Sequence, residues 1–201
     1  GKVTGGEVRE WESGPLAENC NGGLVVKNTG FTAKVESGRF FNAKLKSTRL
    51  AIDDFAAHPY TLSINGAADA RGEEVARDLR ESPLISGVGA FTKSVMIEGP
   101  GTLELSMKIP FNVPEGTKVP TKISGNYTLR RGQAKPVFGP LVTTLSGPVT
   151  FTESGVHSHG LSVVSYGHPV PLEITVSGEG GIVPHFQSRA AFSTHADILR
   201  F

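Results

Sequence analysis

Two histidines separated by one residue, in His157-Ser158-His159, have a spacing that could support chemistry. Alternate side chains of a β-strand lie on the same face, so both imidazoles would point the same way and could hold a metal ion. No Asp, Glu or Cys stands at a spacing that completes the ligand set, since Glu153 falls in a predicted turn. We therefore expect solvent-facing histidines near a strand end, with no metal and no cofactor.

The segment Ser193-Thr194-His195-Ala196-Asp197 contains the residue types of a hydrolase triad. A triad is recognised by its geometry, and residues this close along one strand are poorly placed to hydrogen-bond in series. The chain also lacks the Gly-x-Ser-x-Gly turn that exposes a nucleophilic serine. We interpret this segment as the polar end of a C-terminal strand.

The remaining reactive side chains have equally ordinary interpretations. Cys20 has no cation beside it in the sequence to lower the pKa of its thiol, which favours a bystander role. Three glutamates surround Trp11 and could suggest glycoside hydrolysis, but nothing fixes their separation, and a charged surface strand is favoured; they are Glu7, Glu10 and Glu12. No catalytic constellation emerges, so we do not expect an enzyme. A hydrolase of envelope polysaccharide is the third alternative, since it rests only on scattered Glu and His.

Composition narrows the class of protein. The 201 residues include 20 Lys and Arg and 19 Asp and Glu, so the chain carries almost no excess positive charge with which to bind nucleic acid. A single cysteine excludes a disulfide framework, and 25 glycines with 13 prolines favour many turns between short strands. No run of about 18 apolar residues occurs. Because the chain begins at Gly1 without methionine, we interpret it as a piece of a larger protein, with any export signal or anchor outside it.

Apolar residues alternate with polar ones along most of the chain. The clearest alternation spans residues 102–109 and 170–177, and weaker versions occur at Leu50/Ile52 and Leu62/Ile64. Such alternation predicts half-buried strands with one wet face, and therefore an antiparallel sheet. Residues 72–81 alone have helical spacing, and Pro83 ends that pattern. The prediction is an all-β fold with one short helix.

The chain divides into two blocks, 1–111 and 112–201, at a turn-rich seam over residues 112–116. A faint internal repeat supports this division, because His58-Pro59-Tyr60-Thr61-Leu62 resembles His168-Pro169-Val170-Pro171-Leu172. We expect the second block to continue the sheet of the first.

The apolar face has two interpretations that periodicity alone cannot separate. It could be the core of a closed β-sandwich or a repeat scaffold, or the concave face of an open, curved sheet that holds a ligand. The residues assigned to this face are Leu103, Leu105, Met107, Ile109, Ile123, Tyr127, Leu129, Val149, Phe151, Leu161, Val163, Val170, Leu172, Ile174 and Val176.

A series of motifs in a fixed order resembles the YhdP branch of the AsmA-like superfamily, large bacterial envelope proteins related to TamB. The resemblance covers nearly the whole chain, and the order of the motifs with the single helix carries it. The motifs are Gly5-Gly6-Glu7-Val8-Arg9-Glu10-Trp11, Gly22-Gly23-Leu24, Glu81-Ser82-Pro83-Leu84, Lys108-Ile109-Pro110-Phe111, Ile123-Ser124-Gly125-Asn126-Tyr127, Leu145-Ser146-Gly147-Pro148-Val149, Gly160-Leu161 and Gly167-His168-Pro169-Val170.

The resemblance implies a long, curved antiparallel sheet that forms a U-shaped groove, a taco or half-barrel. It implies a parent protein anchored in the inner membrane by an N-terminal helix absent here, extending on the periplasmic side and moving phospholipid toward the outer membrane. The residues of the apolar face would then line a groove for phospholipid acyl chains. Adjoining groove segments of the same parent chain would be partners, and we expect the excised fragment to self-associate through its cut sheet edges.

Overall fold

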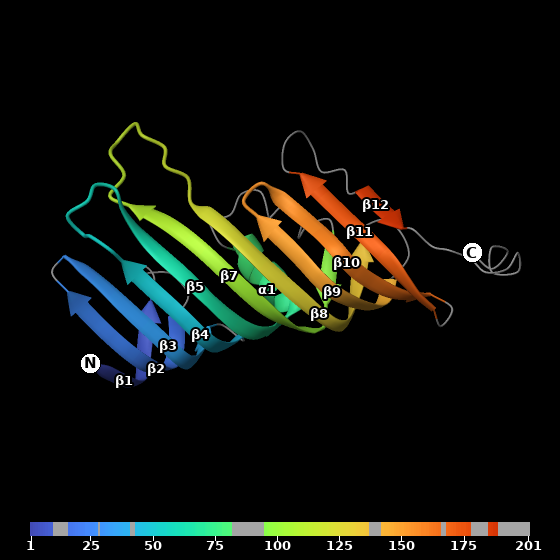
Figure 1. Cartoon of the computed structure of the whole chain (residues 1–201), viewed down its shortest axis with the longest axis horizontal. Coiled ribbons are helices and arrows are strands. Elements are labelled where there is room, and N and C mark those ends of the chain that lie inside the picture. The colour runs from blue at the N-terminus through green and yellow to red at the C-terminus, as the bar shows by residue number, and fades with distance from the viewer. Residues whose placement is uncertain are drawn as a thin grey trace, which may run out of the picture.

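A computed structural model describes residues 1–9, 16–27, 29–40, 43–81, 95–136, 142–165, 168–177 and 185–188. These residues form strands and one helix (Figure 1). The strands are β1 (Lys2–Arg9), β2 (Leu16–Lys27), β3 (Gly30–Phe40), β4 (Ala43–Ile52), β5 (Tyr60–Arg71), β6 (Val95–Glu98), β7 (Pro100–Phe111), β8 (Lys122–Pro136), β9 (Val142–Thr152), β10 (Gly155–Ser165), β11 (His168–Ser177) and β12 (His185–Ser188). The helix is α1 (Gly72–Glu81).

All the described strands belong to one antiparallel sheet, in which consecutive strands pair with each other except around β6, since β5 pairs with β7 and β6 pairs with β8. The order is β1-β2-β3-β4-β5-β7-β8-β9-β10-β11-β12, with β6 paired to the far end of β8. The sheet is open, with β1 and β12 at its two edges, and does not close into a barrel. It continues across the predicted seam, because β7 and β8 flank that loop and pair with each other.

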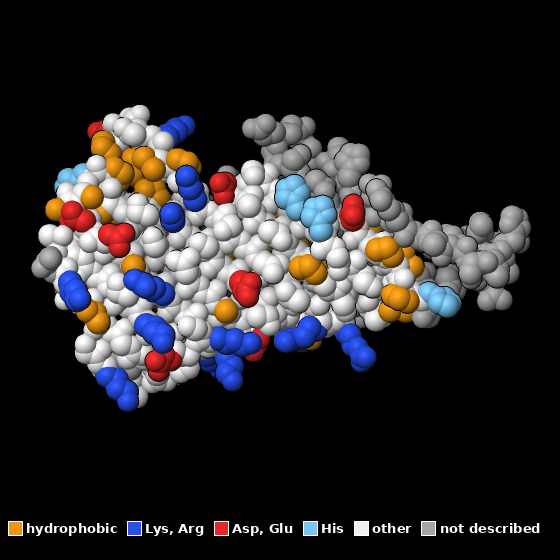
Figure 2. Space-filling view, in the orientation of Figure 1, with side chains coloured by type: hydrophobic (Ala, Val, Ile, Leu, Met, Phe, Trp, Pro, Cys, Tyr) orange, Lys and Arg blue, Asp and Glu red, His pale blue; other side chains and the backbone are white. Residues whose placement is uncertain are grey.

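The register places side chains of neighbouring strands in rows across the sheet. Met107 lies between Ile64 of β5 and Ile123 of β8, and Leu103 lies between Ala68 and Tyr127. The alternation predicted for residues 102–109 is therefore confirmed, and it gives the sheet one apolar face. Figure 2 views the opposite face, where scattered Lys, Arg, Asp, Glu and His side chains lie among uncharged polar groups, backbone and smaller groups of hydrophobic side chains.

The predicted helix over residues 72–81 is also confirmed. It follows β5 directly, carries Glu73 and Glu74 in its first turn, and packs against β5 and β6. Acidic residues suit this position because the first turn of a helix is the positive end of its dipole. The backbone N–H of Gly72 donates to the Gly99 carbonyl oxygen at 2.8 Å, which fixes the start of the helix beside the β6–β7 junction.

A line of irregular pairing crosses most of the sheet, and we call it the bulge row. Register shifts occur within β2, β4, β8, β9 and β10, and the backbone has positive φ at Asn19, Gly99, Arg131, Gly147 and Gly160. Bulges bend strands and increase their twist. The strands accordingly curl at the lower end of the sheet in Figure 1, and the sheet takes the expected U-shaped form.

Tyr127 of β8 holds the bend in place. Its ring lies over Gly101, where an added Cβ would approach the ring to 2.3 Å. Its hydroxyl lies 3.1 Å from the Ala70 carbonyl oxygen and 2.9 Å from that of Gly99, so it can donate to the end of β5 or to the β6–β7 junction. Burial raises the pKa of Tyr127 well above its usual range, which keeps the hydroxyl protonated as a donor.

The close packing of the bulge row predicts that replacing a glycine there lowers the stability of the fold. An added Cβ on Gly147, whose φ is 125°, would lie 2.5 Å from the Gly160 carbonyl oxygen. Gly116 also has positive φ, but nothing lies within 4 Å of its added Cβ. We expect Gly147→Ala to lower the free energy of unfolding by about 3 kcal/mol, from strain plus overpacking. Gly116→Ala should cost about 1 kcal/mol from strain alone. Urea denaturation of both variants measures these changes. Equal losses in the free energy of unfolding would contradict a tightly packed bulge row.

Candidate functional site

The histidine pair lies on the exposed surface of β10. His157 and His159 are exposed on β10, as expected, while Ser158 between them is buried and its Oγ donates to the Pro148 carbonyl oxygen at 2.9 Å. Within the described ranges, no three His, Cys, Asp or Glu side chains lie close enough to hold a metal ion.

Cys20 is buried at the bulge of β2, where desolvation raises the pKa of its thiol. A raised thiol pKa disfavours the nucleophilic thiolate, in agreement with a bystander role. The segment 193–197 and residues 10–12 lie outside the described residues, as does the side chain of Glu7. The hydrolase alternative therefore acquires no support from the described part of the chain.

The predicted apolar-face residues lie on one face, but most of them are covered. Eight belong to the buried core: Met107, Ile109, Ile123, Tyr127, Leu129, Val149, Phe151 and Leu161. Leu103, Leu105, Val163 and Leu172 are partly buried and pack against that core, and Val170 is half-buried. In the β10–β11 register, Ile174 pairs with Ser158 and Val176 pairs with Val156. The side chains of Ile174 and Val176 are not among those that the structure describes.

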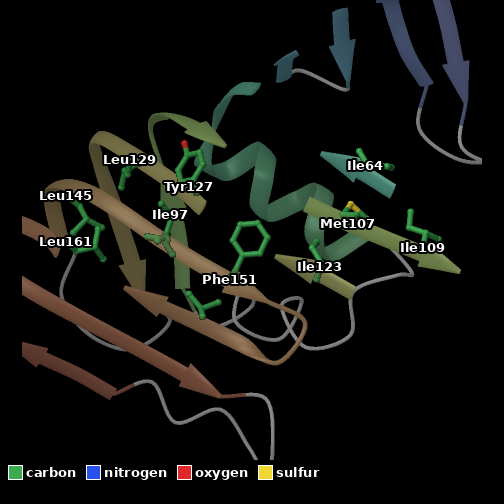
Figure 3. Packing of buried hydrophobic residues seen from close by; sticks show 12 residues of the cluster. Ile64, Ile97, Met107, Ile109, Ile123, Tyr127, Leu129, Leu145, Phe151 and Leu161 are labelled. Atoms are coloured by element: carbon green, nitrogen blue, oxygen red, sulfur yellow. The ribbon is translucent and has the colours of Figure 1, made fainter. Parts of the chain in front are cut away.

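The chain's own residues cover this part of the face. Ile97 of β6, Leu145 of β9 and Val75 of α1 all pack with the core, and Leu145 is 0% exposed. Figure 3 shows Ile97, Leu145 and Leu161 gathered near Tyr127 and Leu129. We call the region over β7–β10 the sealed part of the apolar face. Whether lipid ever contacts its residues stays a prediction.

The same face is accessible at β2 and only partly accessible over β3–β5, and we call the whole of β2–β5 the open part. In register, Leu24 pairs with Ala33, Ala33 with Leu50, and Leu50 with Ile64, so the row continues into the sealed part. Leu24 is 38% exposed and Val26 is 66% exposed, and Ala33 is half-buried. Leu50 and Leu62 are half-buried and pack against the core, and Val35, Ile52 and Ile64 are buried. Sequence reasoning missed Leu24 and Val26 because Leu24-Val25-Val26 is a continuous apolar run without alternation.

Four aromatic side chains lie in series at the end of the strands away from the bulge row, and we call them the aromatic rim. The ring centroids of Phe31 and Phe55 are 5.9 Å apart and stacked, and those of Tyr60 and Phe111 are 5.6 Å apart and stacked. Phe55 joins the two pairs through an edge contact with Tyr60, also at 5.6 Å. Sequence reasoning missed this rim, although three of its members stand at or next to predicted strand ends.

Glu73 connects the helix to the bend through hydrogen bonds. Its carboxylate accepts a hydrogen bond from the Gly99 backbone N–H at 3.0 Å and another from the Arg71 guanidinium. Desolvation raises the pKa of Glu73, but hydrogen bonds from its own backbone and from Gly99, together with Arg71, outweigh it and lower the pKa overall. The ionised form is therefore the one that the folded chain prefers.

These features define an elongated β-protein with an open, bent sheet, one apolar face and one polar face. The chain matches the model of the family described as YhdP protein over residues 9–192, and it belongs to that family, as its motifs predicted. YhdP proteins are bacterial envelope proteins associated with lipid transport. No curated protein and no solved structure matches the chain. In the part of the chain that the structure describes, no helix is long and apolar enough to span a membrane.

The lowered pKa of Glu73 predicts an acid-sensitive attachment of α1. Its ionised form stabilises the folded chain above the ordinary carboxyl pKa, and that stabilisation disappears as pH falls through the lowered pKa. Glu73→Gln should therefore be less stable than wild type at pH 7, and the difference should shrink toward pH 3. Denaturant unfolding across this range measures it. Glu104→Gln, on the exposed polar face, is the control, and its free energy of unfolding should follow that of the wild type at every pH. If Glu73→Gln were less stable than the wild type by the same amount at every pH, the ionised Glu73 carboxylate would not stabilise the fold.

Proposed function

We propose that the open part of the apolar face carries phospholipid acyl chains, as one segment of an inner-membrane-anchored protein that extends on the periplasmic side toward the outer membrane. The segment itself is non-enzymatic. The observation that carries this proposal is the exposed apolar surface of β2, where Leu24 is 38% and Val26 is 66% exposed, continuous in register with the half-buried Ala33 and Leu50 on a sheet whose opposite face is polar.

The energetics of acyl chains make such a surface useful. Each methylene removed from water contributes about 0.8 kcal/mol, so a chain of about fourteen methylenes meets a barrier on the order of 11 kcal/mol if it crosses water unaided. An acyl chain spans half of a hydrocarbon core, or about 15 Å. The eight residues 102–109 span about 26 Å at about 3.3 Å per residue, so the strands are long enough to cover a whole acyl chain.

The side chains of the open part suit transport better than tight binding. Leu, Ile, Val and Ala contact an acyl chain without directional bonds, so a bound lipid can move from one strand to the next. Repeated weak sites allow both entry and release, as they do in conducting pores. The polar face, with residues such as Glu104 and Lys108, would remain in water.

A scaffold function is the second candidate, and the sealed part of the apolar face favours it. A core in which Leu145 is 0% exposed is what a structural or interaction module requires. Such a module would join neighbours through the edge strands β1 and β12. The two functions differ in one respect: only lipid carriage needs the open part to be occupied.

Two adjacent valines of β2 provide a matched test. Val26 pairs with Phe31 and belongs to the apolar face, whereas Val25 pairs with Thr32 on the polar face and is 51% exposed. A carboxylate against an acyl chain loses hydration, so Val26→Glu should reduce bound lipid about tenfold. Val25→Glu should bind as wild type does.

Native mass spectrometry of gently purified protein, with phospholipid added at graded concentrations, measures the occupancy of each variant. Because both valines are largely exposed, neither variant should lose its fold, and melting curves check this. Wild-type protein that takes up no lipid would favour the scaffold function. Equal loss in both variants would show that lipid does not bind the apolar face specifically.

A further inference from the structure

We propose that the aromatic rim receives the glycerol and headgroup region of a zwitterionic phospholipid, whose acyl chains then lie on the open part and point toward the bulge row. This inference rests on the proposed function and adds an orientation, a subsite and a lipid class to it.

The rim borders the open part directly. Phe31 pairs with Val26 of β2 on one side and with Ile52 of β4 on the other, so its backbone position belongs to the apolar face. Phe55 stacks on Phe31 from the loop between β4 and β5 and is 44% exposed. A lipid lying against Val26 and Leu24 would therefore meet Phe31 and Phe55 at the end of the strands.

Side-chain type changes from the rim toward the bulge row. The four aromatic rings lie toward the strand ends, where Phe31 shares its row with Val26, Ile52 and Leu62. The next row toward the bend on the same face is entirely aliphatic: Leu24, Ala33, Leu50 and Ile64. Aromatic side chains, and tyrosine in particular, favour the boundary between an apolar and a wet region, where glycerol and ester groups lie in lipid assemblies. Aliphatic side chains suit the acyl region. The gradient thus places the headgroup at the rim.

The charges around the rim match a headgroup that carries both signs. The hairpin tips that surround it hold three cations, Lys27, Lys118 and Lys122, and three acids, Asp53, Asp54 and Glu115. None of these six takes part in the ion pairs found among the described residues. A phosphate and an ammonium would each find an opposite charge here, whereas a purely anionic headgroup would also meet the acids.

The dimensions agree with this orientation. From Phe111 at the rim to Gly101 near the bulge row, β7 extends for about 33 Å at about 3.3 Å per residue. An acyl chain of about 15 Å that starts at the rim ends near the middle of the strands. It would contact the Leu24 and Leu50 row and would not reach the bend.

Tryptophan fluorescence with brominated lipids tests the orientation. In a Trp11→Phe background, which removes the only native tryptophan, single tryptophans are placed by Phe55→Trp at the rim, Leu24→Trp on the open part and Val25→Trp on the polar face. All three sites are more than a third exposed, so the substitutions should be tolerated, and circular dichroism checks the fold. The probe is a zwitterionic phosphocholine lipid brominated either near the glycerol or farther along the acyl chain.

We expect Phe55→Trp to be quenched more by bromine near the glycerol, Leu24→Trp more by bromine farther along the chain, and Val25→Trp by neither. The opposite order, or no dependence on bromine position, would overturn the orientation while leaving lipid carriage intact. No quenching at either Phe55→Trp or Leu24→Trp would count against lipid carriage itself.

The headgroup is tested separately with unbrominated lipids of the same chain length. The phosphocholine lipid should bind the wild-type chain at least as tightly as an anionic phosphoglycerol lipid does. A tenfold preference for the anionic lipid would overturn the assignment of a zwitterionic headgroup.

Discussion

The bend across the strands is the constraint on which the rest of the structure depends. A single sheet with one apolar face needs a second layer to cover that face, and here the sheet supplies part of this layer by folding over along the bulge row. The bend brings Ile97 and Leu145 onto the core around Tyr127. It requires backbone conformations that glycine adopts easily, at Gly99 and Gly147, and that Arg131 and Asn19 adopt at some cost. Burial of the core offsets that cost.

Local periodicity was sufficient to predict the elements. Strict alternation from Leu103 to Ile109 specifies both the strand and its buried face, because a shift of one residue would turn every apolar side chain to water. The helix at Gly72–Glu81 was equally predictable, since its pattern differs in period from everything around it. The motifs, taken in order, also predicted the family over nearly the whole chain.

The division of the apolar face into sealed and open parts could not be predicted. Leu50 and Leu129 stand in similar alternating patterns, yet Leu50 is half-buried and Leu129 is buried. The difference arises from distant segments, because Ile97 of β6 and Leu145 at the far end of β9 pack with Leu129 in the core. Val75 of α1 adds cover at the bend end of β4 and β5, where it packs against Ala43, Ala68 and Ala70. The aromatic rim was missed for a related reason: Phe55 lies in a loop and meets Phe31 and Tyr60 only once the strands are aligned.

The position of the open part has a consequence for how segments of a lipid path would connect. With about 4.8 Å between neighbouring strands, the eleven strands from β1 to β12 extend roughly 50 Å across the sheet. On the proposed function, a lipid moves in this direction, from strand to strand, and stays out of water only where the face is accessible. That condition holds at Leu24 and Val26 of β2, weakens over β3–β5, where Ile52 and Ile64 are buried, and ends where Leu129 and Leu145 close the core. An adjoining segment that pairs with β1 would extend the accessible face, whereas one that pairs with β12 would be separated from the open part by the sealed part. Edge pairing at β1 is therefore the connection that would make the apolar face continuous for a lipid.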